Sequence, residues 1–522
     1  MPDKGPFYIT TPIYYVNDKP HIGHTYTTVA CDVLARFKRL DGYEVMFLTG
    51  TDEHGLKVMQ AAEAAGVDPQ ALTDKVSQNF RDLTLLMNYS NDDFIRTTEE
   101  RHKKAAQVLW QKIDAAGDLY QDNYGGWYAV RDEAYYTEDE LTSSPDGKKI
   151  APSGAECEWV EEESYFFKLS KWQDRLLEFY DKNPDFVAPQ TRYNEVKSFV
   201  KGGLKDLSLS RTKFDWGVKV PGDDKHVMYV WIDALTNYMT AVGYPDEESE
   251  SFKKFWPADI HMVGKDILRF HAVYWPAFLM SAGLEVPKKI FAHGWWTIEG
   301  EKMSKSLGNV IAPHDLVKRY GVDAARYFML REVPFGNDGD FSHQAAINRI
   351  NADLANGIGN LAQRTLSMIY KNCDEQIPQP NELDSVDMKL LLNSKENMLT
   401  VVRNNLDELK IHSALEEIIK IVSVADGYVD AQAPWTLRKE DPERMKTVLY
   451  VLAEVIRCLG IIMQPITPAS ADKLLDQLKV PKDERNFEHI DEKYALKPGT
   501  KIDKPEGVFP RIVEEEERGV GT

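Results

Sequence analysis

The opening stretch of the chain strongly constrains the fold, because it predicts one strand joined to one helix by a polar turn. Residues 7–16 are mostly aromatic or β-branched, a composition typical of a buried strand. A turn follows at Asn17, Asp18 and Pro20, residue types that interrupt strands. From Thr25 the apolar residues recur with helical spacing. A strand that leads directly into a helix favours an α/β fold.

The same order of elements repeats at once. Residues 43–48 form a short apolar run that predicts a second parallel strand, and an Ala-rich helix is expected over residues 56–65. Strand, helix, strand, helix is the doubly wound pattern, in which ligands bind at the carboxyl ends of the strands. Both polar turns should therefore open on one crevice. Asp52, in the second turn, could pair with a substrate ammonium or simply cap the next helix.

The alternating pattern resumes in the middle of the chain. Strands of the same sheet are expected at 227–232, 259–263 and 290–292. Each is followed by polar residues, among them Lys265 and His293. Because parallel strands end at one edge of a sheet, these groups should reach the same rim as Asp52.

Two segments depart from this pattern. Residues 118–226 consist of short alternating pieces rich in aromatic, Gly, Pro and charged residues, which predicts an α+β insertion. Residues beyond about 347 are almost wholly helical, which predicts a bundle. The expected architecture is a doubly wound Rossmann-type parallel sheet with an insertion, followed by an α-helical bundle. The predicted divisions are 1–117, 118–226, 227–299, 300–346 and 347–522.

Composition excludes several classes of protein. At 522 residues the chain is too long for one core, and about 150 residues per domain suggests roughly three domains. A net charge of −20 argues against broad binding to nucleic acid or anionic membranes, although one specific RNA remains compatible with it. The four scattered cysteines, the polar N-terminus and the lack of a long uncharged apolar stretch predict a cytoplasmic protein without a membrane span.

Two short motifs suggest contacts with phosphate. His21, Gly23 and His24 lie where the first strand leads into its helix, a place suited to anions, and each imidazole can donate a hydrogen bond. Taken alone, such histidines are more often surface or capping residues. A Gly-flanked loop also carries Lys302 and Lys305, whose flexible charges could fold over a polyphosphate, whereas a solvated loop is the plainer alternative.

Taken together, the two motifs resemble the paired motifs of class I aminoacyl-tRNA synthetases. The resemblance is closest to the methionyl-tRNA synthetase family and covers essentially the whole chain. The segment 118–226 is too short for the editing insertion of the valine, isoleucine and leucine enzymes. The stretches that carry the resemblance are 21–24, 49–55, 229–234, 292–295 and 302–306, with 360–364 and 433–435 for the anticodon-reading elements.

The resemblance implies a methionine–tRNA ligase that uses ATP with Mg²⁺. Methionine and ATP would form methionyl-adenylate, and methionyl would then pass to the terminal adenosine of tRNA(Met). Because the methionine carboxylate can attack the α-phosphate directly, positioning and charge stabilisation would be sufficient for catalysis.

By the same resemblance, roles pass to particular residues. The catalytic residues would be His21, His24, Lys302 and Lys305, and ATP would be bound by these with Gly23, Lys265 and Ser304. Methionine would be bound by Ile13, Tyr15, Asp52, Trp231, Ala234, Leu235, Tyr238 and His293, and the anticodon by Asn360, Arg364 and Trp435. For each aromatic residue taken alone, core packing is the more common role.

The sequence also departs from the family pattern. Many members bind zinc through Cys-x-x-Cys knuckles in the insertion, but the matching place here is Tyr128–Asp132, and Cys157 stands alone. Structural zinc needs four Cys or His ligands, so no zinc is expected. The chain ends soon after the helical segment, without the appended dimerisation module of some relatives, which favours a monomer.

Two other functions remain open at this stage. One is a different nucleotidyl transferase with the same histidine chemistry, such as a pantothenate-type ligase or a cofactor adenylyltransferase. The other is a non-catalytic tRNA-binding paralogue. The helical segment argues against the first, and the intact histidines and lysines argue against the second.

Overall fold

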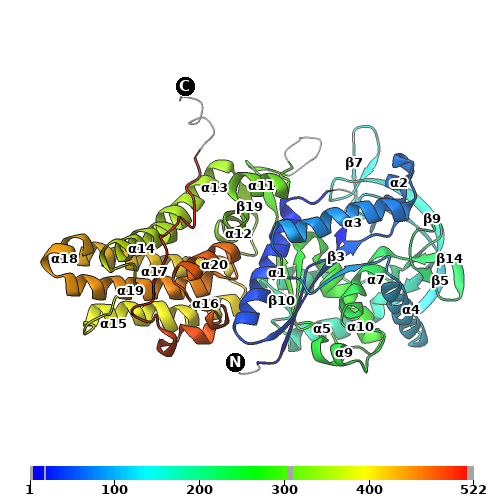
Figure 1. Ribbon diagram of the computed structural model, residues 1–522. Coiled ribbons are helices and arrows are strands. Elements are labelled where there is room, and N and C mark those ends of the chain that lie inside the picture. The colour runs from blue at the N-terminus through cyan, green and yellow to red at the C-terminus, as the bar shows by residue number, and fades with distance from the viewer. Residues whose placement is uncertain (1–3, 17–18, 133, 303–309, 514–522) are drawn as a thin grey trace.

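The computed structural model describes residues 4–16, 19–132, 134–302 and 310–513. A sheet-centred part and a helical part lie side by side, with helix α1 (Ile22–Leu40) close to the boundary between them (Figure 1). Among the described residues, no helix is both long and apolar enough to cross a membrane.

A parallel β-sheet is the frame of the first part. Its strands follow the order β10–β16–β15–β1–β3–β2, and β4 also pairs with β3. In its middle, Ile9 of β1 lies opposite Ile260 of β15 on one side and Phe47 of β3 on the other. The prediction of a doubly wound parallel sheet is confirmed. The strands are β1 (Pro6–Thr10), β2 (Tyr14–Tyr15), β3 (Glu44–Asp52), β4 (Asp93–Arg96), β10 (Val187–Ala188), β15 (Ile260–Gly264) and β16 (Ile290–His293).

Helices accompany the sheet. Helix α1 begins at Ile22, earlier than the expected Thr25, because the His21 side chain caps the backbone N–H groups of its first turn. The apolar face of α1, with Val29, Val33 and Phe37, is fully buried. The other helices of this part are α2 (Leu56–Ala65), α3 (Pro69–Leu86), α4 (Glu100–Ala115), α5 (Gln173–Lys182), α6 (Gln190–Lys201), α7 (Val230–Leu235), α8 (Asn237–Thr240), α9 (Glu250–Phe255) and α10 (Trp275–Ser281).

The strand predicted over 227–232 is wrong in two respects. Strand β14 (Asp223–Met228) contains only the first two of these residues, and it belongs to a small antiparallel sheet with β12 (Ser210–Arg211) and β13 (Lys219–Val220), not to the parallel sheet. The remaining residues start helix α7. A short apolar run does not distinguish a buried strand from a helix that is buried on most sides, and α7 is of the second kind.

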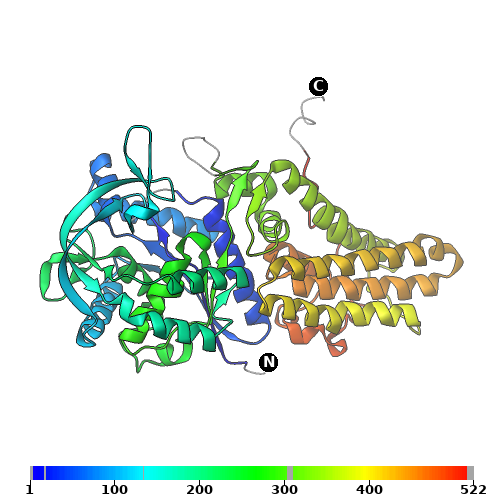
Figure 2. The ribbon, with the colours of Figure 1, turned by 180° about the vertical axis from the view of Figure 1, so that it is seen from behind.

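The segment between the two halves of the sheet forms an antiparallel sheet of its own. Figure 2 shows its long curved strands, in cyan, at the outer side of the sheet-centred part. A short strand from the same segment, β10, joins the edge of the parallel sheet beside β16. The antiparallel strands are β5 (Leu119–Ala129), β6 (Ala134–Tyr136), β7 (Thr142–Ser143), β8 (Lys149–Ile150), β9 (Glu156–Phe167) and β11 (Leu207–Ser208).

After the parallel sheet, a short sheet and two helices lead to the helical part. These elements are β17 (Trp296–Ile298), β18 (Glu301–Lys302), β19 (Gly339–Phe341), α11 (Pro313–Tyr320) and α12 (Val322–Arg331). The helical part confirms the predicted bundle. It consists of α13 (His343–Arg349), the π-helical stretch Ile350–Gly359, α14 (Asn360–Asn372), α15 (Ser385–Leu392), α16 (Met398–Asp407), α17 (Ile411–Gln432), α18 (Pro434–Glu440), α19 (Pro442–Met463) and α20 (Pro468–Gln477).

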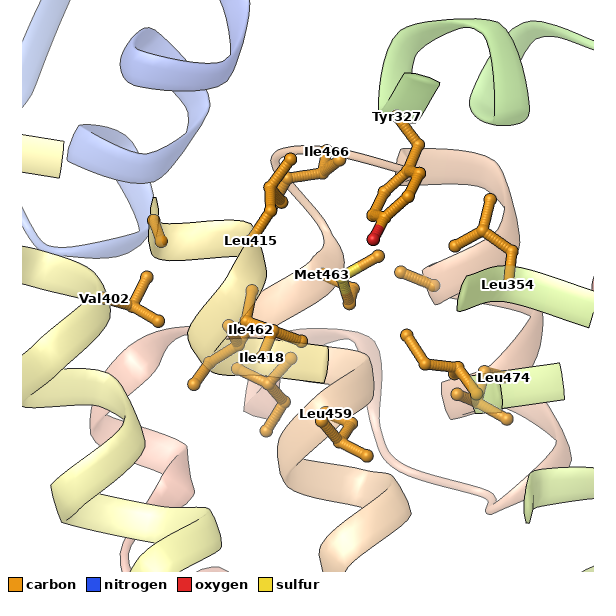
Figure 3. Close-up of a cluster of buried hydrophobic side chains, with 14 of the residues drawn as sticks. Tyr327, Leu354, Val402, Leu415, Ile418, Leu459, Ile462, Met463, Ile466 and Leu474 are labelled. Carbon is orange, nitrogen blue, oxygen red and sulfur yellow. The ribbon is translucent and has the colours of Figure 1, made fainter. Parts of the chain in front are cut away.

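The bundle has a continuous apolar core that reaches α1. Figure 3 shows Leu354, Val402, Leu415 and Met463 converging from different helices. At the boundary, the Phe37 ring of α1 lies 4.7 Å from that of Phe487 between centroids. The two parts of the molecule are therefore joined by packed side chains at α1.

Candidate active site

His21 and His24 stack on each other at the amino end of α1, with ring centroids 3.8 Å apart. The backbone N–H of Gly23 donates to Nδ1 of His21, and the backbone N–H of His21 donates to Nδ1 of His24, each at 3.1 Å. An Nδ1 atom that accepts a hydrogen bond carries no proton, so each neutral ring holds its proton on Nε2. The turn therefore presents two Nε2–H donors at a helix N-terminus, whose dipole attracts anions.

Burial keeps both imidazoles uncharged. It lowers the pKa of His21, although the Asp266 carboxylate acts in the opposite direction. Burial lowers the pKa of His24 well below its ordinary value, and the neighbouring His21 adds to this effect. The pair can therefore donate hydrogen bonds to phosphate oxygens with the same proton arrangement across neutral pH.

Lys265 follows β15 at the same rim, where a carboxylate holds it. Its ammonium group donates to both oxygens of Asp338, at 2.7 and 2.6 Å, and lies 4.3 Å from the ring centroid of Trp295. Trp295 in turn donates its backbone N–H to Asp338 and its indole N–H to Asp266. Lys265 thus lies at the strand end beside His293, and any phosphate that bound it would compete with Asp338.

The predicted lysine loop begins at the end of β18. Lys302 ends that strand, and its backbone pairs with Thr297 of β17. Ser304 and Lys305 lie outside the described residues. The carboxylate of Asp340 on β19, two residues after Asp338, accepts the Thr297 hydroxyl at 2.7 Å. The β17–β18 hairpin, which leads into the loop, is therefore tied to β19, the strand that follows Asp338.

Several residues predicted to bind methionine lie on adjacent strands. Tyr15 of β2 is the partner of Asp52 of β3 in the sheet register, and Asp52 is buried at the carboxyl end of its strand. The Tyr15 hydroxyl donates to the backbone carbonyl of His54 at 3.0 Å. Ile13 and Tyr15 pack against the apolar cluster that includes Tyr238.

Helix α7 and the residues after it supply the aromatic side of this cluster. Trp231 stacks on Phe270 with centroids 3.7 Å apart, and Ala234 and Leu235 are buried on the same helix. Tyr238 stacks on His261 at 4.0 Å. The structure thus brings Tyr15, Trp231, Leu235 and Tyr238 to one apolar cluster, a setting that favours a thioether because sulfur contacts aromatic rings well.

His293 has a different set of neighbours. Its Nδ1 donates to the carbonyl of Gly294 at 2.8 Å, which leaves Nε2 to accept the Thr27 hydroxyl at 2.7 Å. Its ring also meets the edge of Tyr26 at 5.3 Å. These contacts connect the end of β16 to α1, on the side of the histidine turn.

The residues predicted to contact the anticodon gather on the helical part. Asn360 and Arg364 are exposed on α14, one turn apart and therefore on the same face. The guanidinium of Arg364 lies 5.7 Å from the ring centroid of Trp435, which is in the first turn of α18 and is 46% exposed. An exposed aromatic face beside a guanidinium is suited to stacking with an unpaired base.

Comparison with known proteins gives one family for the whole chain. Residues 7–366 match the family model of class I tRNA synthetases (M), and residues 377–520 match the anticodon binding domain of methionyl tRNA ligase. A methionine–tRNA ligase from Mesorhizobium japonicum is 58% identical over 509 residues, which cover 98% of each chain. The chain belongs to the methionyl-tRNA synthetase family.

Solved structures of that family agree with this assignment. The Mycobacterium tuberculosis methionyl-tRNA synthetase in complex with methionyl-adenylate is 53% identical and superposes with a TM-score of 0.95, covering 97% of this chain and 100% of that one. The apo form of the M. tuberculosis enzyme, 49% identical, gives 0.88, covering 98% and 99%. The fold of this methionyl-tRNA synthetase family member is thus close to that of an adenylate-bound relative.

Sequence reasoning missed two acidic residues near the predicted cation. Asp338, in the turn before β19, holds the Lys265 ammonium, and Asp266, which directly follows Lys265, accepts the indole N–H of Trp295. It also missed Asp233, although this residue falls within the stretch 229–234 that carried the family resemblance. A carboxylate in an otherwise apolar run is the signal that could have identified Asp233, because buried charges require partners.

The absence of zinc stays a prediction. Among the residues that the structure describes, no group of three or more His, Cys, Asp or Glu side chains could hold a metal ion. Cys157 is buried with Ala129, Ala151 and Ala155 in a small apolar cluster, in the region where other family members carry zinc knuckles. Apolar packing supports this part of the insertion.

Proposed function

We propose that the chain ligates methionine to tRNA(Met) at the cost of ATP. In the first step a carboxylate oxygen of methionine attacks the α-phosphate, a new O–P bond forms, and pyrophosphate leaves. In the second step a hydroxyl of the terminal adenosine attacks the adenylate carbonyl, an ester forms, and AMP leaves. Family membership along the chain supports this reaction, and the pair of uncharged histidine donors at the start of α1 is the observation that carries it.

In this proposal the rim of the sheet binds the nucleotide. The Nε2–H groups of His21 and His24 donate to phosphate oxygens, and Gly23 lets the nucleotide approach the backbone. A donor fixed in this way contributes about 3–4 kcal/mol of transition-state stabilisation, and holding both reactants together contributes about 7–11 kcal/mol. Three cations, Lys265 of the rim with Lys302 and Lys305 of the loop, would complete the site together with the hydroxyl of Ser304. ATP enters as its Mg²⁺ complex.

Methionine would bind between β2, β3 and α7. Asp52 and the Ile13 backbone would hold the ammonium group, and the side chain would lie among Tyr15, Trp231 and the residues near them. The apolar cluster and the buried position of Asp52 support this arrangement. The full set is Ile13, Tyr15, Asp52, Trp231, Ala234, Leu235, Tyr238 and His293.

The helical part would read the anticodon of tRNA(Met). Asn360 and Arg364 offer hydrogen bonds to base edges, and Trp435 offers a stacking face. The enzyme would act as a monomer in the cytoplasm, and its buried free thiols, such as Cys31 and Cys458, suit a reducing compartment. The functional divisions would be 1–117 and 227–299 for catalysis, 118–226 for the insertion, 300–346 for the lysine loop and stem contact, and 347–522 for the anticodon.

Amino-acid-dependent exchange of pyrophosphate into ATP tests the first step. Each of the twenty amino acids is supplied in turn, and we expect exchange that depends on methionine. Transfer is then tested by charging of tRNA(Met). A nucleotidyl transferase of another class would show no exchange with any amino acid, and a non-catalytic tRNA-binding protein would bind tRNA without exchange, so either result contradicts the proposal.

A further inference from the structure

A buried carboxylate bridges two histidines beside the proposed methionine site. The Oδ2 atom of Asp233 lies 2.7 Å from Nδ1 of His54, and its Oδ1 atom lies 2.7 Å from Nε2 of His102. All three side chains are buried, with Asp233 and His102 fully enclosed. Three elements distant in sequence meet there: Asp233 is on α7, His102 on α4, and His54 in the turn after β3.

The polarity of this cluster follows from the charge of Asp233. Burial raises the pKa of this carboxyl, but the contacts with His54 and His102 outweigh that effect and lower the pKa to about 2. An ionised carboxylate can only accept hydrogen bonds. His54 must therefore donate from Nδ1 and His102 from Nε2, so the carboxylate fixes the proton position and the orientation of both rings.

His54, whose ring is held by Asp233, also contacts residues at the proposed methionine site. Its backbone carbonyl accepts the hydroxyl of Tyr15 at 3.0 Å, and it is two residues from Asp52. Its ring meets the edge of Trp216 at 5.4 Å, and the Trp216 indole donates to the carbonyl of Glu53 at 2.6 Å. The turn that carries Asp52 is therefore held in a defined position against α7.

Helix α7 supplies the opposite side of the same site. It carries Trp231, Ala234 and Leu235 on either side of Asp233. The bond between Asp233 and His54 therefore links the proposed ammonium anchor to the helix that carries the apolar side-chain hole. The same turn is also held to strand β4, because Arg96 donates to both carboxylate oxygens of Glu53, at 2.7 and 2.9 Å.

We propose that Asp233 is a positioning residue for methionine, which sets the distance between the ammonium anchor at Asp52 and the side-chain hole on α7. This inference rests on the proposed function. It gives Asp233 no contact with the substrate and no role in the chemical step. Loss of the carboxylate should therefore weaken methionine binding while the nucleotide side, at the start of α1, is unaffected.

The variant Asp233→Asn tests this with little change in volume. The amide presents a donor to one of the two imidazole N–H groups, so one ring must change tautomer or turn away. In methionine-dependent pyrophosphate exchange we expect the KM for methionine to rise about tenfold or more. The KM for ATP should stay within about twofold, since the histidine turn is not part of the cluster.

A matched control separates positioning from general support of the fold. Asp387 of the helical part is an equally buried carboxylate, bonded to Tyr428 and Arg444. Asp387→Asn removes a buried charge in the same way, yet it should leave both KM values unchanged. If Asp233→Asn raises the two KM values together, or lowers kcat alone, Asp233 is not a positioning residue for methionine.

A second variant decides the question if Asp233→Asn does not fold. His102→Asn removes the distal support but keeps the bond between Asp233 and His54, and it should raise the KM for methionine about threefold with the KM for ATP unchanged. An unchanged KM for methionine would overturn the inference. Wild-type protein without methionine-dependent exchange would refute the proposed function itself, a result that is independent of every variant.

Discussion

The carboxylate of Asp32 accepts a hydrogen bond from the guanidinium of Arg326 at 2.6 Å, and both side chains are fully buried. Arg326 also donates to the backbone carbonyls of Pro465 and Ile466, in the loop between α19 and α20. Asp32 lies in the middle of α1, the helix that begins beside His21. One buried ion pair thus connects the helix of the histidine turn to the helical part.

Removal of the cation should destabilise the protein strongly. Arg326→Met leaves Asp32 buried and without its main cation, which costs about 3–5 kcal/mol. The double variant Asp32→Asn/Arg326→Met should recover part of that loss, because the site then holds no buried carboxylate with only the partly exposed Arg36 as its cation. Urea unfolding followed by circular dichroism measures both. Equal stability of the single variant and wild type would show that the pair contributes nothing net.

The histidine turn should give the protein a defined dependence on pH. The pKa values of His21 and His24 are lowered by burial, so the unfolded chain takes up these protons first as pH falls. Their contribution to stability is complete above about pH 6.5 and is lost as pH falls toward the folded-state pKa values.

The lowered pKa values of His21 and His24 also determine the pH below which activity should fall. Pyrophosphate exchange should show no loss from histidine protonation until pH is below about 6.5.

The stability effect is measured separately. The melting temperature measured from pH 8 to 5 should fall less steeply in His24→Gln, which has no imidazole to protonate at that position. In the pH profile of pyrophosphate exchange, a midpoint of the acid limb at or above pH 6.5 would contradict the lowered pKa values of the two histidines.

Removal of the carboxylate that holds Lys265 should strengthen ATP binding. Asp338→Asn removes the carboxylate that holds its ammonium, together with one negative charge near the proposed phosphate site. We expect the KM for ATP to fall about two- to fivefold at low salt, and by less at high salt because the pair is close to solvent. The KM for methionine is the internal control and should not change. A rise in the KM for ATP would mean that Asp338 orients Lys265 for binding instead of restraining it.

Trp435 should affect transfer but not activation. It is exposed on α18, beside Arg364, and belongs to the helical part. Trp435→Ala should leave methionine-dependent exchange intact and lower kcat/KM for charging of tRNA(Met) about tenfold or more, since one stacked base contributes about 1–3 kcal/mol. Parallel loss of both activities would indicate a structural role for this residue.

Zinc should be absent from the purified protein. The small apolar cluster around Cys157 supports the insertion by packing. Elemental analysis should therefore find less than stoichiometric zinc, and EDTA should leave the melting temperature unchanged. One zinc per chain, removed by chelation with loss of stability, would refute this prediction.

Much of the fold could be predicted from local patterns along the chain. The helix expected over 56–65 has those bounds in the structure. Strand β3 starts where residues 43–48 predicted it but continues through Asp52, which was expected in the following turn. Periodicity is a local property, so long helices and alternating strands are visible without tertiary contacts. It failed over 227–232, where a short apolar run is compatible with either element and only its neighbours select the helix.

The sequence by itself determined the family, the sheet with its helices, and the residue types at the ends of the strands. Tertiary structure alone decided which charges meet. Asp338 and Lys265 are 73 positions apart, and His102 and Asp233 are 131 apart, so their pairing depends on how the strands and helices pack. Proton positions were decided in the same way: the Nε2–H groups of His21 and His24 are donors because the backbone of α1 occupies both Nδ1 atoms.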